Sequence, residues 1–274
     1  MNRRWYPAPA KLNLFLHVLG PRPDGYHELQ TAFRLIDRAD RVGIAARADG
    51  EIRFSGDYGD DNLVVRAARL LKKETGAQGG AELALEKVIP VGGGLGGGSS
   101  DAATVLLVLN KLWNVQLARP ALASMAARLG ADVPFFVHGR NAIGEGIGER
   151  LTPLDLPPAW YLVLEPQVSV STKEIFASAL THDTKRLKIP PFFPGQGRND
   201  LEAAVVAKHP EVNAHLEWLR QRCPQARMTG SGACVFAEFR SESEARALHA
   251  QLPRDMQGFV ARGLDRHPLC EWHD

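Results

Sequence analysis

Residues 89–103 read IPVGGGLGGGSSDAA, a run of glycines (the glycine loop, residues 92–98) that leads straight into a predicted helix. Six glycines allow the backbone to turn its N–H groups inward and to approach a ligand closely. The helix that follows points the positive end of its dipole at the same place, which favours an anion. We expect Ser99 or Ser100 to cap this helix, and either hydroxyl is also a candidate ligand for a phosphate or a metal ion. The stretch therefore predicts a phosphate-binding loop.

Three other interpretations of the glycine loop fit its surroundings less well. A flexible Gly/Ser linker joins domains, whereas these glycines lie between a strand-like stretch at residues 83–89 and an apolar helix at residues 102–113. A dinucleotide-binding loop matches the spacing of Gly92, Gly94 and Gly97, but it requires an acidic residue about twenty positions further on, after a second strand. The chain continues as helix there. A P-loop requires a lysine after its last glycine, and none follows here.

The composition is that of an ordinary globular protein. With 274 residues, 45% of them hydrophobic and 23% charged, the chain can bury a sizeable core, and we expect one compact unit of two lobes. Thirty-three basic and 31 acidic residues give a formal net charge of +2 without a basic block, which argues against nucleic acid and against an anionic membrane as partners.

The cysteines and the apolar runs bear on the compartment. The three cysteines lack metal-ligand spacing and are typical of reduced thiols in a cytosol. No stretch reaches transmembrane length, and prolines interrupt the N-terminus before any apolar run develops. We therefore expect a soluble, cytoplasmic protein.

A strand is predicted at residues 10–18, where apolar residues alternate with a second set that includes Lys11 and Asn13. Because alternate residues of a strand share a face, Lys11 and Asn13 point the same way. A lysine on a strand is commonly a solvated charge at a sheet edge. The pattern alone leaves that interpretation of Lys11 open.

Two further segments offer chemistry together with a structural alternative. The turn at residues 21–25 presents Tyr26 and His27, whose rings suit a heteroaromatic base by stacking and by hydrogen bonding to its edge. Tyr26 is equally suited to a half-buried place at the start of a strand. Asp132 precedes a proline and two phenylalanines, where it either caps a short helix or accepts a proton from a substrate hydroxyl.

The remaining pattern mixes helices and strands and predicts an α+β protein. Short strands are expected within residues 29–56, including 42–46 and 51–55 joined by a hairpin turn at Asp49-Gly50, and further strands at 82–88, 160–165 and 259–264. Helices are expected at 63–74 after an Asn62 cap, at 102–113, 120–129, 211–222 and 242–252, around Phe176, and after a capping box at 199–202. Prolines near residues 154–158 divide the chain into lobes at 1–156 and 157–274, and residues 185–198 form a proline-rich excursion.

Five segments together carry a resemblance to the GHMP kinases, the superfamily of galactokinase, homoserine kinase, mevalonate kinase and phosphomevalonate kinase. They are PAKLNL at 9–14, RPDGYHEL at 22–29, PVGGGLGGGSSDAA at 90–103, LGADVPFF at 129–136 and TGSGACVF at 229–236. Within the superfamily they are most similar to the kinases that act on a cytidine diphosphate-linked methylerythritol in the non-mevalonate isoprenoid pathway. The resemblance spans essentially the whole chain and is weakest at residues 181–198.

The resemblance implies a fold, an activity and a set of site residues. The fold is the two-lobed α+β GHMP kinase fold, with an N-terminal lobe of the ribosomal-protein-S5-domain-2 type, a C-terminal α/β sandwich and the active site in the cleft between them. The activity is transfer of the γ-phosphoryl group of ATP, with Mg²⁺, to the 2-hydroxyl of the small-molecule substrate. Asp132 takes the hydroxyl proton and Lys11 lies beside it. The metal ligands and the oligomeric state remain unknown.

The other implied site residues bind the nucleotide or the cytidyl substrate. The nucleotide set is Asn62, Pro90, Gly92, Gly93, Gly94, Leu95, Gly96, Gly97, Gly98, Ser99 and Ser100. The substrate set is Asn13, Tyr26, His27, Thr172 and Phe176, with Phe176 stacking on the cytosine face opposite Tyr26 and His27. Another small-molecule kinase of the superfamily, or a non-catalytic nucleotide-binding protein on the same fold, is the alternative.

Overall fold

The computed structural model describes residues 3–59, 61–179 and 197–270. Helices and strands are mixed along the chain, so the predicted α+β class is confirmed. Most of the proline-rich excursion expected at residues 185–198 lies outside the described residues.

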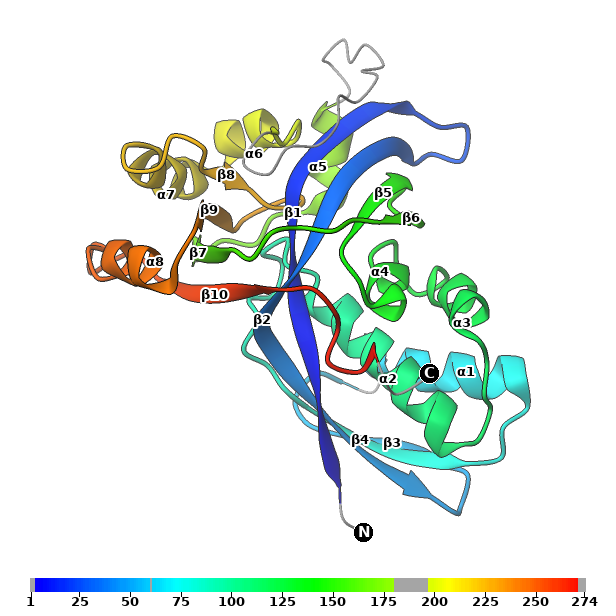
Figure 1. The fold of residues 1–274 in the computed structure, drawn as a ribbon. Coiled ribbons are helices and arrows are strands. Elements are labelled where there is room, and N and C mark those ends of the chain that lie inside the picture. The colour runs from blue at the N-terminus through cyan, green and yellow to red at the C-terminus, as the bar shows by residue number, and fades with distance from the viewer. Residues whose placement is uncertain (1–2, 60, 180–196, 271–274) are drawn as a thin grey trace.

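Two long antiparallel strands form the centre of the molecule (Figure 1). β1 (Arg4–Pro21) pairs with β2 (His27–Arg47) along nearly its whole length. The prediction of short strands within residues 29–56 was wrong up to residue 47, because β2 is one strand of 21 residues that includes residues 42–46, whereas the short strand predicted at 51–55 is confirmed at residues 52–55. The other edge of β2 pairs, in order along the strand, with β5 (Ala142–Gly146), β10 (Gly258–Leu264) and β4 (Gly80–Glu86). These partners come from distant parts of the chain, so local patterning did not reveal them.

The other strands extend the sheet on both sides of β2, in the order β3-β4-β2-β10-β7-β9-β8. β3 (Ile52–Ser55) pairs in parallel with β4, so the hairpin predicted at Asp49-Gly50 was wrong. The turn exists, with Gly50 at φ 75°, but it joins strands that are not neighbours. The remaining strands are β6 (Arg150–Pro153), β7 (Trp160–Leu164), β8 (Arg227–Met228) and β9 (Val235–Phe239).

Eight helices are described, four in each half of the chain (Figure 1). Those of the first half are α1 (Leu63–Thr75), α2 (Gly97–Leu112), α3 (Arg119–Ala126) and α4 (Val133–His138). Those of the second half are α5 (Thr172–Ala179), α6 (Glu202–Lys208), α7 (Pro210–Arg220) and α8 (Glu242–His249).

Two predicted helix caps were wrong. α2 begins within the glycine loop, with Gly96 at the N-cap position and no side-chain cap, so neither Ser99 nor Ser100 caps it. The capping box expected at residues 199–202 is absent, since Leu201 is the N-cap of α6 and the Glu202 carboxylate accepts a hydrogen bond from the Met228 N–H at 3.0 Å instead. At Glu202 a long-range contact thus replaced the expected local one.

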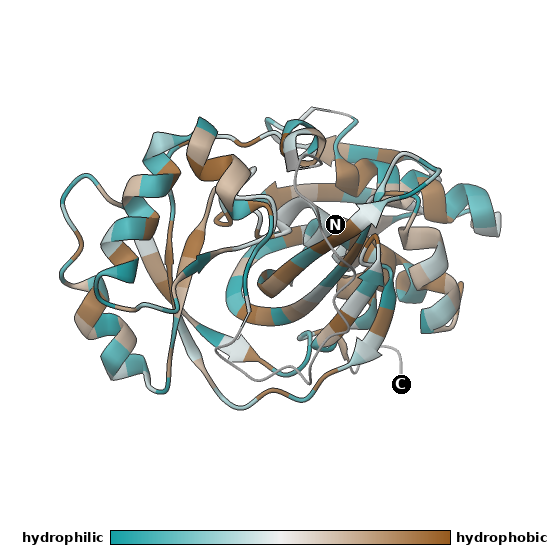
Figure 2. Cartoon of the chain, turned by 90° about the horizontal axis from the view of Figure 1, so that it is seen from above, coloured by the Kyte–Doolittle hydropathy of each residue, from teal (hydrophilic) through white to brown (hydrophobic). Residues whose placement is uncertain are grey.

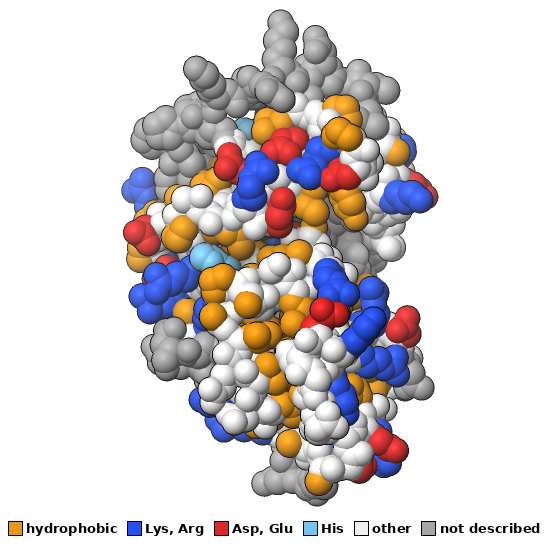
Figure 3. Space-filling view, turned by 90° about the vertical axis from the view of Figure 1, so that its right-hand side faces the viewer, with side chains coloured by type: hydrophobic (Ala, Val, Ile, Leu, Met, Phe, Trp, Pro, Cys, Tyr) orange, Lys and Arg blue, Asp and Glu red, His pale blue; other side chains and the backbone are white. Residues whose placement is uncertain are grey.

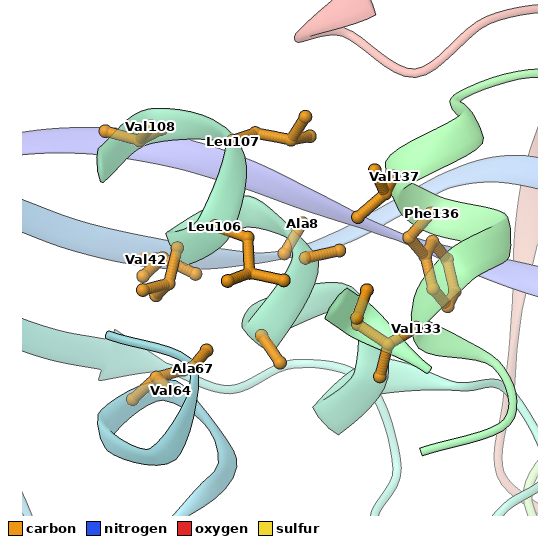
Figure 4. Packing of buried hydrophobic residues seen from close by; sticks show 14 of the residues in the cluster. Ala8, Val42, Val64, Ala67, Leu106, Leu107, Val108, Val133, Phe136 and Val137 are labelled. Atoms are coloured by element: carbon orange, nitrogen blue, oxygen red, sulfur yellow. The ribbon is translucent and has the colours of Figure 1, made fainter. Parts of the chain in front are cut away.

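The core has α2 at its centre. Leu106, Leu107 and Val108 of α2 are fully buried and pack among residues of β1, β2, α1 and α4 (Figure 4). A second cluster lies between the strands β7–β9 and the helices of the second half, and a third lies between β1, β2 and β7. The brown, hydrophobic segments of the ribbon accordingly lie mainly on strands and on the inner faces of helices (Figure 2).

The two predicted lobes share a hydrophobic cluster. Leu16 and Val18 of β1 belong to the second cluster, although they precede the predicted boundary at residues 156 and 157. The boundary itself stays a prediction.

The surface carries both signs of charge. On the face shown in Figure 3, basic and acidic side chains are interspersed among neutral ones, in keeping with the net charge of +2. Within the described ranges, no helix combines the length and the apolar character that spanning a membrane requires.

After β10 the chain crosses back to α3 and α4. The N–H of His267 donates to the carbonyl of Gly139 at 2.9 Å, and the Arg119 guanidinium binds the carbonyls of Val137 and Cys270. The His267 ring is buried, and its Nδ1 accepts a hydrogen bond from the Leu269 N–H at 3.0 Å. Burial and the nearby Arg119 charge lower the pKa of His267 to about 3.

This buried histidine makes stability fall in acid. Its folded pKa of about 3 lies below the unfolded value of about 6.5, so the unfolded chain binds more protons between these two pH values. We expect the free energy of unfolding to drop by about 1 kcal/mol from this group between pH 7 and 5.5. His267→Asn, which keeps an acceptor near the Nδ1 position, should remove that part of the pH dependence in urea titrations. His209→Asn is the control and should retain it.

Candidate active site

A single large cavity of about 1100 Å³ brings the predicted site residues together. Its walls come from β1, the turn before β2, the glycine loop and the start of α4, and from α5 and the turn between β8 and β9. Of the predicted residues, it is lined by Lys11, Asn13, Tyr26, His27, Asn62, Pro90, Gly92, Gly93, Gly94, Leu95, Gly96, Gly97, Gly98, Ser99, Asp132, Thr172 and Phe176.

The glycine loop has the conformation that a phosphate-binding loop requires. Gly92, Gly94 and Gly96 have φ of 74°, 76° and 72°, in the left-handed region that side chains disfavour. A Cβ at Gly94 would also collide with the carbonyl oxygen of Thr229, so the two backbones approach closely. The carbonyls of Gly93, Gly94 and Leu95 all accept hydrogen bonds from the protein. The acceptors thus face the protein, while α2 presents its N-terminal N–H groups at the cavity.

The two serines after the loop lie differently. Ser99 lines the cavity. Ser100 does not, because its side chain is fully buried in the protein. Among the described residues, only Ser99 of this pair therefore offers its hydroxyl to a bound phosphate or metal ion.

Lys11 is buried rather than exposed at a sheet edge. Its side chain is 3% exposed, and Nζ lies 3.5 Å from Oδ2 of Asp132. The ammonium also donates to the carbonyl of Gly94 at 2.8 Å and to Oδ1 of Asn13. Burial lowers the pKa of Lys11, and the charge and hydrogen bond of Asp132 oppose that shift. The lysine thereby links β1, the glycine loop and Asp132.

Asp132 has an open carboxylate. It occupies the N-cap position of α4 but makes no side-chain cap hydrogen bond, and its side chain is 33% exposed. The capping interpretation of Asp132 is thus wrong in its chemistry, although its position at the helix start is right. A carboxylate held by one buried lysine and open to a cavity can accept a proton from a hydroxyl.

Two threonines support this pair, and sequence reasoning missed both. Asn13 donates from Nδ2 to Oγ1 of Thr31 at 2.8 Å and from its backbone N–H to Oγ1 of Thr229 at 2.9 Å. Thr229 begins the Thr-Gly-Ser-Gly turn, so that turn was its signal. Thr31 has no local signal, because only the pairing of β1 with β2 brings it beside Asn13.

Aromatic side chains gather at another part of the cavity. Tyr26 is 57% exposed, so it is not the half-buried tyrosine of a strand start. The rings of His27 and Phe176 stack with centroids 5.4 Å apart and an angle of 21° between planes. Next to them, the hydroxyls of Thr172 and Ser231 are 2.7 Å apart. Two halves of the chain therefore build one aromatic and polar wall.

Asn62 caps α1, as predicted, and also lines the cavity. Its Oδ1 accepts hydrogen bonds from the N–H groups of Val64 and Val65, both at 3.1 Å. Three charged cavity residues were not predicted as site residues, namely Lys87, Asp101 and Lys173. In the part of the chain that the structure describes, no group of three His, Cys, Asp or Glu side chains is arranged to hold a metal ion.

Comparison with known proteins identifies the family of this chain. The family described as "GHMP kinases N terminal domain" matches residues 62–140, and "GHMP kinases C terminal" matches residues 188–258. The 4-diphosphocytidyl-2-C-methyl-D-erythritol kinase of Nitrosospira multiformis is 59% identical, over 97% of this chain and 93% of that protein. The kinase of the same name from Thiobacillus denitrificans is 58% identical, over 97% of this chain and 98% of that protein.

Solved structures agree with the sequence matches. A crystal structure of 4-(cytidine 5'-diphospho)-2C-methyl-D-erythritol kinase aligns with a TM-score of 0.82 and 36% identity, over 95% of this chain and 99% of that chain. The mevalonate kinase of Methanococcus jannaschii has a TM-score of 0.68 at 15% identity, over 96% of this chain and 99% of that chain, and so shares the fold. The predicted GHMP kinase fold is confirmed. The chain belongs to the 4-diphosphocytidyl-2-C-methyl-D-erythritol kinase family of the GHMP kinases.

Proposed function

We propose that this protein transfers the γ-phosphoryl group of ATP to the 2-hydroxyl of 4-diphosphocytidyl-2-C-methyl-D-erythritol, giving the 2-phosphate and ADP in the non-mevalonate isoprenoid pathway. Family membership supports the activity and the substrate. The observation that carries the mechanism is that Lys11 and Asp132, 3.5 Å apart, line the same cavity as the glycine loop.

Asp132 is the proposed general base. Its carboxylate takes the proton of the 2-hydroxyl as that oxygen forms a bond to the γ-phosphorus. The bond between the γ-phosphorus and the bridging oxygen breaks, and ADP leaves with that oxygen. The partial exposure of Asp132 to the cavity supports this role, because the base must reach the substrate hydroxyl.

Lys11 is proposed to orient this base and to offset negative charge. Its ammonium is fixed by the Gly94 carbonyl and the Asn13 side chain, so it holds Asp132 at one position. Charge on the transferring phosphoryl oxygens is best stabilised by groups already in place before reaction. The N–H groups of the glycine loop and the start of α2 add to that stabilisation.

ATP binding follows from the family, and magnesium is part of the proposal. Magnesium, when bound, neutralises phosphate oxygens and orients them for in-line transfer. Mg²⁺ sites with substrate phosphates commonly use few protein ligands and several waters. The cavity suits such a site, because Ser99 lines it beside the glycine loop. Ser99 is therefore the candidate protein ligand.

The cytosine is proposed to bind at the aromatic wall. Tyr26 and Phe176 supply stacking faces, and His27 supplies ring nitrogens for the edge of the base. Thr172, whose hydroxyl is near Ser231, and Asn13 are proposed as further substrate contacts. The exposure of Tyr26, at 57%, supports a ligand-binding role over a packing role.

We also propose that the chain works as two lobes, 1–156 and 157–274, with this cavity between them, and that it is located in the cytoplasm. The lobe proposal is supported by the cavity wall, which takes the glycine loop from the first lobe and Phe176 from the second. One assay tests the activity itself. ADP release should require the cytidyl substrate, and homoserine, mevalonate and galactose should not replace it. Turnover of one of those alcohols without cytidine would identify another small-molecule kinase.

Removing the proposed base should slow the chemical step. Asp132→Asn should lower kcat by about 10²–10⁴, because the amide cannot accept the hydroxyl proton. The Kd for a non-hydrolysable ATP analogue should stay unchanged by calorimetry. Asp255→Asn, which alters an exposed carboxylate that does not line the cavity, is the control. Near-normal turnover by Asp132→Asn would rule out this base.

Removing the stacking ring should weaken substrate binding. Tyr26→Ala should raise the KM for the cytidyl substrate by about 5–100-fold, since base stacking on an aromatic ring contributes about 1–3 kcal/mol. The KM for ATP should not change. Tyr58, 49% exposed and also in the cavity wall, provides the matched control. If Tyr26→Ala and Tyr58→Ala affect the cytidyl KM equally, the stacking role of Tyr26 is wrong.

A further inference from the structure

Three charged side chains lie beneath the glycine loop, and the mechanism above does not use them. They are Asp40 of β2, Lys87 just after β4, and Asp101 of α2, called here the charge triad. Their side chains are 0%, 11% and 3% exposed, respectively. Lys87 donates to Oδ2 of Asp40 and, at 2.6 Å, to Oδ2 of Asp101.

Asp40 also holds the backbone that leads into the loop. Its Oδ1 accepts hydrogen bonds from the N–H of Val88 at 2.6 Å and of Ile89 at 2.8 Å. Hydrogen bonds from backbone N–H groups to a buried carboxylate are among the stronger ones in proteins. The chain between β4 and the loop is therefore attached to the middle of β2.

Asp101 attaches the other end of the loop to the same point. It lies four residues after Gly97, the first residue of α2, and reaches Asp40 through the shared ammonium of Lys87. A Cβ at Gly97 would lie 3.2 Å from Oδ2 of Asp40, so the start of α2 packs directly against the triad. One buried charge group thus fixes the entry and the exit of the glycine loop.

The charges also explain why Lys87 is not free to bind phosphate. Lys87 lines the cavity, but two carboxylates share its ammonium. Removing one partner from a buried ion pair is costly, which keeps the lysine with the carboxylates. The triad therefore has no excess positive charge with which to bind a phosphate. Its contacts instead join β2, the segment after β4 and the first turns of α2.

We propose that Asp40, Lys87 and Asp101 are positioning residues for the triphosphate. They hold the first turn of α2 at the distance from β4 at which the N–H groups of the loop meet the phosphates. This role rests on the proposed use of ATP, since it concerns how well the loop is arranged to bind it. A displacement of about 1 Å in a binding group can cost about a hundredfold in rate.

Substitutions at Asp101 test the proposal, because Asp101 reaches Lys87 through Oδ2 while Oδ1 has no partner among the described residues. Asp101→Ala should raise the Kd for a non-hydrolysable ATP analogue and the KM for ATP by about 10–100-fold. The KM for the cytidyl substrate should stay within about twofold. Asp101→Asn keeps an oxygen acceptor for Lys87 and should restore the Kd to within about threefold of the parent value.

The control must separate positioning from stability. Glu82→Ala removes a carboxylate from the same strand, β4, that pairs with Arg3 and Arg47 but does not line the cavity. It should lower Tm without changing the Kd of the folded enzyme. If Asp101→Ala does not fold, Lys87→Gln tests the same contact, and it should also raise the Kd.

Three results overturn the proposal. The first is a parent-like Kd for Asp101→Ala, with or without a lower Tm, because it would make the triad purely structural. The second is a lower Kd of Asp101→Ala for the ATP analogue, because it would mean that Lys87, once released from Asp101, contributes to binding by contacting the triphosphate directly. The third is an equal rise of both KM values. The Kd measurement needs no turnover, so a parent enzyme that binds the analogue but is inactive on the cytidyl substrate would refute the proposed function and leave this test intact.

Discussion

The buried ammonium of Lys11 is the constraint on which the site depends. An ion that loses its water must be paired and hydrogen-bonded, or the folded state loses several kcal/mol. Lys11 meets this requirement with the carbonyl of Gly94, the side chain of Asn13 and the carboxylate of Asp132. These partners lie on β1, the glycine loop and the start of α4, so satisfying one charge fixes three elements relative to one another. The same contacts leave the Asp132 carboxylate facing the cavity.

The glycine loop is held from every side that does not face the cavity. The Cys234 N–H donates to the Gly93 carbonyl at 3.1 Å, Lys11 binds the Gly94 and Leu95 carbonyls, and the charge triad lies beneath the start of α2. Glycine permits this because the loop backbone approaches the Thr229 carbonyl too closely for any Cβ. A loop that is flexible as an isolated sequence is thereby ordered by its neighbours, and its N–H groups are arranged before a phosphate arrives.

Contacts with distant segments explain the predictions that failed at β2 and at Glu202. β2 contains the charged residues Asp37, Arg38 and Asp40, which interrupt the apolar pattern, yet three successive partners keep the strand continuous. Asp40 binds Lys87 and the N–H groups of Val88 and Ile89. These partners are far away in the sequence, so the residues around Asp40 do not reveal why a buried carboxylate stands there. The caps expected at Ser99 or Ser100 and at residues 199–202 also failed, since α2 begins earlier, within the glycine loop, and the Glu202 carboxylate binds the distant Met228 N–H. Local rules describe hydrogen bonds and packing within a segment, whereas these segments make such contacts with distant parts of the chain.

The sequence alone determined the chemistry of the parts. A glycine run entering a helix predicts an anion site, alternation puts Lys11 and Asn13 on one face, and Asn62 begins α1 because its cap involves only adjacent backbone. The five motifs, through their resemblance to a family, supplied the expectation that Lys11 and Asp132 meet. Only the tertiary structure decided which hydroxyl reaches the cavity, since Ser99 and Ser100 are equivalent in sequence and differ by one step around a helix. Only the tertiary structure placed Thr31 and Thr229 beside Asn13, and Lys87 between Asp40 and Asp101. The hydrogen bonds concerned join residues 14 to 216 positions apart, so they depend on strand pairing and burial rather than on local pattern.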